Sequence, residues 1–192
     1  MPIQRKQRVT VTFRDAMLIY KNFAGVKKQY NNEGDRNFSI LLEEGQALQL
    51  QQDRNKWGDT WNIKPVKKRD PDEEQLYHLK VAVKFGDYPP DCWLMSSGGK
   101  IKLPEEMVGM LDKLQAVKID LTIAASDWEV NGNTGRKAYL ETIYFRMYEN
   151  ELALEYRDVP EIGSVSQNMP LELEAGQRPG DYIDAEVVED NI

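Results

Sequence analysis

Basic and aromatic side chains recur together in the sequence, a combination that could bind a polyanion. Lysines and arginines occupy the polar side of alternating segments such as RVTVTFR (residues 8–14) and LYHLKVAVKF (residues 76–85). Cations of this kind contact phosphates, and aromatic rings stack on unpaired bases at roughly 1–3 kcal/mol per base. The candidate contacts to a nucleic-acid strand are Arg36, Phe38, Trp57, Trp61, Lys64, Lys67, Lys68, Lys80, Trp93, Lys100, Trp128, Arg136, Lys137 and Tyr139. For each residue alone, the alternative is an ordinary solvated surface or, for the tryptophans, a place in the core.

Residues suited to catalysis or metal binding are few. His78 and Cys92 are the only histidine and cysteine, which argues against a histidine cluster or a zinc site. The glycine-rich segments SSGGK (residues 96–100) and GNTGRK (residues 132–137) lack the spacing of a phosphate-binding P-loop, so we interpret both as hairpin turns. The acidic loop at residues 70–75 lacks EF-hand spacing. We therefore expect no catalytic residue, no metal and no cofactor, with a Mg²⁺-dependent nuclease as a minor alternative.

Charge is distributed unevenly along the 192 residues, whose net charge is −7. Residues 1–69 hold 14 Lys and Arg against 7 Asp and Glu, whereas residues 149–192 hold 2 against 12. Such asymmetry favours a basic binding surface and an acidic tail. From residue 158 the sequence is polar, acidic and without period, which predicts a flexible, disordered tail. This tail is a solubilising segment, a competitor for the basic surface, or a docking peptide that uses Asp181, Asp184, Glu186, Glu189, Asp190 and Ile192.

The elements that must position these side chains begin with a long hairpin at residues 117–147. A period of two in its first arm predicts an inward row of Val117, Ile119, Leu121 and Ile123. The turn NGNTG at residues 131–135 tolerates positive φ, and the return arm is rich in residues that suit a pleated sheet. The hairpin would carry an aromatic and basic set near its tip: Trp128, Arg136, Lys137 and Tyr139.

Shorter elements precede this hairpin. Strands are expected at residues 8–14, 17–23, 38–42, 61–64 and 76–85. A second hairpin joins CWLM to KIKL, with Ile101 and Leu103 inward. One helix is expected at residues 43–56, where acids occupy the first turn. Another of about three turns is expected after Pro104, because apolar residues recur there at helical spacing: Met107, Met110, Leu111 and Leu114.

These elements predict a mainly β fold with one or two short helices. We favour a small β-barrel of the oligonucleotide-binding (OB) type over a different α+β sheet. The expected organisation is an OB-like domain at residues 1–157 and a flexible acidic tail at residues 158–192. No apolar segment approaches the roughly 20 residues of a membrane span, and no secretory signal is recognisable, so a cytosolic protein is expected.

Three segments resemble a family of bacteriophage single-stranded DNA-binding proteins. They are YNNEGDRNFSILL (residues 30–42), WNIKPVKKRDPDEEQLYHLKVAVKF (residues 61–85) and DWEVNGNTGRKAYLETIYF (residues 127–145). The likeness extends over residues 8–148, and its most specific parts are the GDRNF run and the hairpin around Trp128 and Tyr139. It implies an OB-type fold and binding of single-stranded DNA with little sequence preference. The acidic tail is similar to that of bacterial single-stranded DNA-binding proteins, although it ends in Asp190-Asn191-Ile192 rather than Pro-Phe.

The resemblance implies a role in phage DNA replication or recombination, in the cytoplasm of the infected bacterial host. We therefore expect a non-enzymatic protein that binds and protects single-stranded DNA. Its tail would modulate binding or dock replication or recombination proteins. No membrane association is expected, and a homo-oligomer is left open. The alternative is a phage structural or assembly module that self-associates without nucleic acid.

Overall fold

The structure, a computed structural model, describes residues 8–156, 158 and 159. Its strands are β1 (Thr10–Phe13), β2 (Leu18–Asn22), β3 (Arg36–Leu42), β4 (Ile63–Pro65), β5 (Tyr77–Val83), β6 (Asp91–Ser96), β7 (Gly99–Lys102), β8 (Ala116–Val130) and β9 (Asn133–Met147). Its helices are α1 (Glu44–Gln52), the 3₁₀ helix η1 (Val108–Asp112) and α2 (Glu151–Glu155). The mainly β fold with short helices is confirmed.

The chain divides into two compact units, Met1–Leu154 and Glu155–Ile192. All the strands belong to the first unit. The residues expected to dock a partner lie outside the described part of the chain: Asp181, Asp184, Glu186, Glu189, Asp190 and Ile192. The flexible tail and its boundary at residue 158 therefore stay a prediction.

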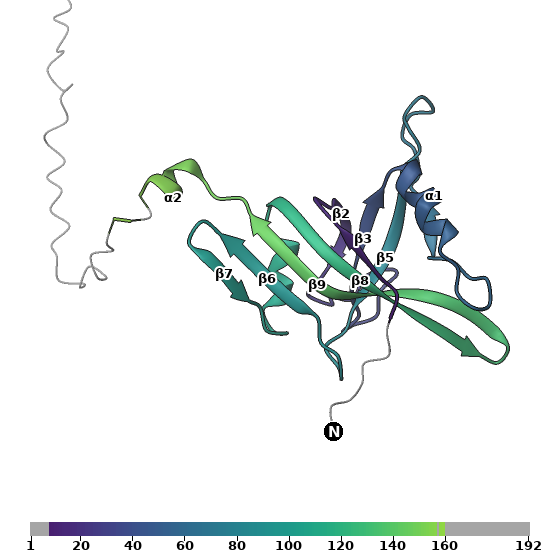
Figure 1. Cartoon of the computed structure of the whole chain (residues 1–192). Coiled ribbons are helices and arrows are strands. Elements are labelled where there is room, and N and C mark those ends of the chain that lie inside the picture. Colours follow the sequence, from purple (N-terminus) through teal and green to yellow (C-terminus); the bar gives the residue numbers. More distant parts are fainter. Residues whose placement is uncertain (1–7, 157, 160–192) are drawn as a thin grey trace, which may run out of the picture. The chain divides into compact units, whose positions relative to one another are not determined.

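The strand order is that of an OB barrel. The hydrogen-bonded path runs β1-β8-β9-β5-β3-β2 (Figure 1), with β5 and β9 parallel and the other neighbours antiparallel. Since β1 and β2 are consecutive parts of one bent strand, β3 and β5 are the second and third barrel strands, and β8 and β9 the fourth and fifth. The β6–β7 hairpin extends the sheet from β9, to which β6 runs parallel.

A sharp bend between β1 and β2 joins the two ends of this sheet. The amide of Ala16 donates to the carbonyl of Ile119 in β8 at 2.7 Å. The carbonyl of the next residue, Met17, accepts from the amide of Leu41 in β3 at 2.9 Å. Asp15, just before this switch, has a φ of 51°. The barrel is therefore closed by the chain itself at the bend.

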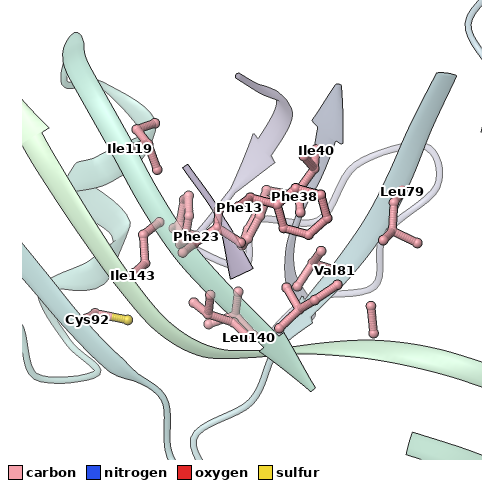
Figure 2. Packing of buried hydrophobic residues seen from close by; sticks show 14 of the residues in the cluster. Phe13, Phe23, Phe38, Ile40, Leu79, Val81, Cys92, Ile119, Leu140 and Ile143 are labelled. Atoms are coloured by element: carbon pink, nitrogen blue, oxygen red, sulfur yellow. The ribbon is translucent and has the colours of Figure 1, made fainter. Parts of the chain in front are cut away.

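The alternating apolar residues of the strands meet in one core. Figure 2 shows part of this cluster, including Phe13, Phe38, Ile40, Leu79, Val81, Leu140 and Ile143. Alternate residues of β6 such as Cys92 and Leu94 lie inside, as the period of two predicts, whereas β3 is buried along most of its length. Cys92 also lies in the core, where burial raises the pKa of its thiol to about 12. This cysteine therefore acts as a small apolar side chain rather than as a nucleophile.

The prediction of a three-turn helix after Pro104 is wrong. The chain forms only η1 there, which buries Val108 and Leu111 while Met107 is 44% exposed. The two buried residues are three apart, which is the period of a 3₁₀ helix rather than that of an α-helix.

Tertiary contacts decide this local structure. Gly109 is a poor α-helix former, and a Cβ there would lie 3.1 Å from Ala24, so the absence of a side chain permits a close approach. The carboxylate of Asp112 accepts hydrogen bonds from the backbone amides of Phe23 and Ala24 at 2.8 and 2.9 Å. These contacts fix η1 against the segment that follows β2.

Two residues expected in the core are exposed instead. Val117 is 57% exposed because a β-bulge between Ala116 and Lys118 shifts the register of β8 against β9. The other three members of the expected inward row are buried, as predicted. Ile101 is 52% exposed because β7 is an edge strand whose residues are all exposed.

Helix α1 begins where the sequence places it. Glu43 and Gln46 form a capping box, in which the amide of Glu43 donates to Oε1 of Gln46 at 3.1 Å. The helix ends at Gln52, earlier than expected, and Asp53 follows it directly.

The far part of the long hairpin forms a two-stranded extension. The bonds from β8 to β1 and from β9 to β5 end near Ala125 and Ala138. Beyond them the two strands pair only with each other, and Figure 1 shows them extending past the other strands. We call residues 126–137 the arm. Its turn has Asn131 and Gly132 at φ of 52° and 79°, as a type I′ turn requires, so the predicted hairpin is confirmed.

Candidate nucleic-acid interface

A groove of about 960 Å³ lies beside β5. Its walls come from the start of β3, the segment between α1 and β4, and the arm. Six of the residues singled out from the sequence line it: Arg36, Trp61, Lys80, Trp128, Arg136 and Lys137. OB folds bind their ligands across the second and third strands and beside the turn between the fourth and fifth. The groove occupies this position, because those elements are β3, β5 and the arm.

Three exposed lysines line the groove, together with the carboxylates of Asp35, Asp59 and Glu105. Among the described residues, Lys80, Lys84 and Lys137 form no ion pair with a carboxylate. The ammonium of Lys80 donates to Oδ1 of Asn31 at 3.2 Å. Those of Lys84 and Lys137 lie 5.8 and 5.4 Å from the ring centroid of the half-buried Tyr139. Their charge is therefore free to contact phosphates.

Trp128 presents an aromatic ring on the arm. It is 42% exposed and pairs across the hairpin with Gly135. A Cβ at Gly135 would lie 2.5 Å from Cζ2 of Trp128, so the indole rests directly on the glycine backbone. The absence of a side chain at this position therefore lets the ring lie flat against the arm, and its remaining surface can stack on a base.

Arg136 is enclosed rather than exposed at the hairpin tip. Its side chain is 2% exposed, with Nε 2.7 Å from Oδ1 of Asp127 and Nη1 2.9 Å from Oδ2 of Asp53. The indole Nε1 of Trp61 donates to the same oxygen of Asp53 at 2.9 Å. We call these four residues the arm lock, because they join the arm to the end of α1. Arg136 is therefore a structural residue of the groove wall and offers no free charge to a phosphate.

Electrostatics hold the arm lock in its charged form. The hydrogen bond from Arg136 lowers the pKa of the Asp127 carboxyl, and the same contact raises the pKa of the guanidinium. A planar guanidinium can bind two carboxylates at once with fixed geometry. The orientation of the arm, and with it that of Trp128, is thereby fixed.

Arg36 is also paired with an acid. Its Nη1 lies 2.7 Å from Oε1 of Glu105, and its guanidinium carbon lies 5.7 Å from the ring centroid of Phe85. The Arg36 side chain is 23% exposed. Glu105 neutralises this cation locally, so the lysines carry most of the free positive charge of the groove.

Two predicted ring contacts belong to the core. Phe38 and Trp61 are 0% and 2% exposed. Phe38 packs on Phe23 with ring centroids 5.1 Å apart, and the guanidinium carbon of Arg136 lies 5.4 Å from the Trp61 ring. Neither ring presents a free face to a base, and the core placement considered for the tryptophans is correct for Trp61.

Besides Phe38, seven of the predicted contacts do not line the groove: Trp57, Lys64, Lys67, Lys68, Trp93, Lys100 and Tyr139. Trp57 is 37% exposed and lies before β4, with the ammonium of Lys56 4.1 Å from its ring centroid. Lys64 lies on β4. Burial lowers the pKa of the His78 imidazole, and the positive charge of Lys64 lowers this pKa further. The exposed Lys67 and Lys68 follow β4, while Trp93 and Lys100 belong to the β6–β7 hairpin.

Three residues of the groove and its walls were not among the candidate contacts. Lys84 follows β5 and continues its outward row, which the period of two marks as basic. Gly135 looked like an ordinary turn residue. No local signal marks Asp53, whose partner Arg136 is 83 residues away.

The fold and the groove define an OB-like β protein with a basic, partly aromatic surface for an extended anionic ligand. The sequence matches the model of the family described as a putative phage single-stranded DNA-binding domain over residues 2–191, and the chain belongs to this family.

Solved structures give weaker likenesses. The single-stranded DNA-binding protein from bacteriophage Enc34 in complex with single-stranded DNA has 12% identity and a TM-score of 0.47, over 73% of this chain and 88% of that one. The single-stranded DNA-binding protein gp2.5 encoded by bacteriophage T7 has 10% identity and a TM-score of 0.38, over 83% and 100%. No curated protein sequence matches this chain significantly.

Within the described part of the chain, no group of three His, Cys, Asp or Glu side chains could hold a metal ion. None of the helices described there is long and apolar enough to cross a membrane.

Proposed function

We propose that this chain binds single-stranded DNA in the groove beside β5. The observation that supports this most is the exposed ring of Trp128 next to three unneutralised lysines, Lys80, Lys84 and Lys137. Bases would stack on the indole while the lysines contact the phosphates. Since every base has a π-face, such binding has little sequence preference. Membership of a family described as phage single-stranded DNA-binding supports the same ligand.

Fluorescence anisotropy with labelled oligo-dT, the matching RNA and a duplex tests this proposal. Single-stranded DNA should bind best at low salt. The logarithm of its affinity should fall linearly with the logarithm of salt concentration, by about 0.7 per neutralised phosphate. Intrinsic fluorescence should be quenched mainly through Trp128, so a Trp128→Phe variant should lose most of the quenching. Absence of binding to single strands at low salt would overturn the proposal.

The wider role that we infer is protection of single-stranded DNA during phage replication or recombination, in the cytoplasm of the infected bacterial host. A non-enzymatic mechanism suits this role, because binding alone shields the strand. Incubation of a saturated complex with a single-strand nuclease tests protection. The bound strand should survive longer than free DNA, without being cleaved by the protein itself in the presence of Mg²⁺.

The tail at residues 158–192 has a separate proposed role, either in modulating DNA binding or in docking replication or recombination proteins. Its acids outnumber its bases, so it can compete with DNA for the lysines of the groove. A chain shortened after residue 157 should therefore bind oligo-dT more tightly than the full chain, most of all at low salt. Equal or weaker binding would rule out competition and leave docking or solubilisation as the role of the tail.

A further inference from the structure

We propose a second contact surface for the same DNA strand on the outer face of the sheet formed by β7, β6, β9 and β8. This inference rests on the proposed function and extends it from one groove to a two-part site. The surface, which we call the outer platform, consists of Trp93, Met95, Lys100, Lys102, Lys118, Asp120, Tyr144 and Arg146. None of these residues lines the groove.

Strand register brings the platform together from distant parts of the sequence. One row across the sheet pairs Lys102 with Trp93, Trp93 with Tyr144, and Tyr144 with Asp120. The neighbouring row contains Lys100, Met95, Arg146 and Lys118 in the same strand order. Residues between these positions on β6, β8 and β9 are buried, so both rows point away from the core.

Aromatic rings and lysines occupy the centre of the platform. The rings of Trp93 and Tyr144 lie within 6° of parallel, with centroids 6.3 Å apart. The ammonium of Lys100 lies 4.7 Å from the first centroid and 5.7 Å from the second. Tyr144 is 37% exposed. An arriving base can therefore take the place of the ammonium over the rings, while the lysine moves to a phosphate.

The charge of the platform favours an anionic occupant. It holds four cations, in a chain whose net charge is −7. Lys102 lies 2.6 Å from the carboxylate of Asp91, and Lys118 lies near that of Asp120. Within the described part of the chain, Lys100 and Arg146 therefore carry the unpaired positive charge of the platform. Asp120 is already engaged, since it accepts from the amide of Asp15 at 2.9 Å and its carboxylate lies 3.6 Å from the ammonium of Lys118. Lys118 and Arg146 face each other across β8 and β9. Like charges in this position destabilise a sheet, and a phosphate between them would relieve the repulsion.

A break separates the platform from the groove. Tyr144 lies six residues beyond Ala138 on β9, which corresponds to about 20 Å along a strand. The exposed Glu141 lies between them at the bulge where the register of β8 and β9 shifts. A strand that fills only the groove would therefore not reach the platform, whereas a longer strand could contact both.

This separation predicts a dependence on oligonucleotide length, measurable by anisotropy with labelled oligo-dT. The series should run from about 4 nucleotides to well beyond 16, the range of site sizes for one OB fold. The affinity of the full chain should rise again once the strand reaches the platform. Tyr144→Ala should reduce the affinity for long strands roughly 5- to 100-fold, which is the equivalent of one stacked base. Its affinity for the shortest bound strand should be unchanged.

Lys100→Glu provides a second variant at an exposed position, and Lys113→Glu is a matched control that lies on neither surface. Lys100→Glu should also reduce the affinity for long strands selectively, whereas Lys113→Glu should reduce the affinity for all strand lengths slightly and equally. The platform proposal is overturned if both platform variants bind long strands with the affinity of the unmodified chain. It is also overturned if the two variants lose the same affinity at every strand length. If the unmodified chain binds no strand of any length, the proposed function itself fails, which is a different result.

Discussion

The groove and the outer platform contain similar residues but use them differently. In the groove, Arg36 and Arg136 are held by carboxylates of the protein, and free charge remains on lysines. In the platform, Lys118 and Arg146 face each other. The planar guanidinium suits fixed ion pairs, and the flexible lysine suits a ligand whose position varies. A cation in this chain therefore contributes to folding or to binding according to its partners.

Removal of Arg136 should have the largest effect. Arg136→Ala leaves Asp53 and Asp127 without their cation, which should lower the free energy of unfolding by about 2–3 kcal/mol. The arm should loosen, so DNA affinity should fall as well. Urea unfolding and oligo-dT anisotropy measure the two effects. Arg136→Lys keeps the charge but loses the two-sided geometry, so it should recover only part of the stability. Unchanged stability of Arg136→Ala would show that the arm lock does not hold the arm.

Substitution of Gly135 should change binding more than stability. A Cβ in Gly135→Ala would displace the Trp128 ring. The binding free energy for oligo-dT should therefore weaken by at most the contribution of one stacked base, which is roughly 1–3 kcal/mol. Gly98→Ala is the matched control, because its Cβ would meet only Oγ of Ser96 at 3.7 Å. In the double variant with Trp128→Ala, the two losses should not add. Additive losses would mean that Gly135 acts independently of the indole.

Removal of a free lysine should leave the fold intact. Lys137→Ala should change the free energy of unfolding by less than about 0.5 kcal/mol. The slope of log affinity against log salt should become less steep by about 0.7, because one phosphate fewer is neutralised. Lys113→Ala, which removes a lysine outside both surfaces, should not change this slope. If the Lys137→Ala variant keeps the original slope, Lys137 does not contact a phosphate.

Acidification should have the smallest effect on the groove, where it acts through Asp127. The hydrogen bond from Arg136 lowers the pKa of Asp127 in the folded chain, so its contribution to stability is complete above the unfolded value of about 3.9. The contribution is lost as pH falls from there through the folded pKa. Asp127→Asn should therefore be less stable than the original chain at pH 7 but equally stable in strong acid. Urea unfolding across this range measures the difference, and a gap independent of pH would contradict the assignment.

The sequence predicted the strands well because burial of alternate residues is a local pattern. Leu79, Val81 and Val83 show this pattern within one segment, and all three are buried. The role of Arg136 could not be read in the same way. Its neighbours in the sequence suggest an exposed basic tip, and only the fold brings Asp53 to it. The burial of Trp61 has the same origin, since its Nε1 is satisfied by that carboxylate.

Contacts between elements also decide features that the pattern of one segment cannot predict. The Val117 side chain is exposed because of a bulge in the pairing of β8 with β9. The residue pattern of one strand alone does not reveal such a bulge. The 3₁₀ form of η1 depends on the close approach of Ala24 to Gly109. The groove as a whole was foreseen only as a set of residue types, of which six meet there. Their ion pairs separate the residues that support the walls from the lysines that remain available to a ligand.

The bend that closes the barrel has a consequence for how the protein is made. β1 pairs with β8 over a long separation in sequence, since Thr12 lies opposite Thr122, 110 residues away. At roughly 5–20 residues per second, a ribosome needs about 5–20 s to add that length of chain. Until then β1 has no partner, while β2 and β3 can already pair. β1 is thus among the last strands to be fully paired, and the protein acquires its closed form only after β8 has been made.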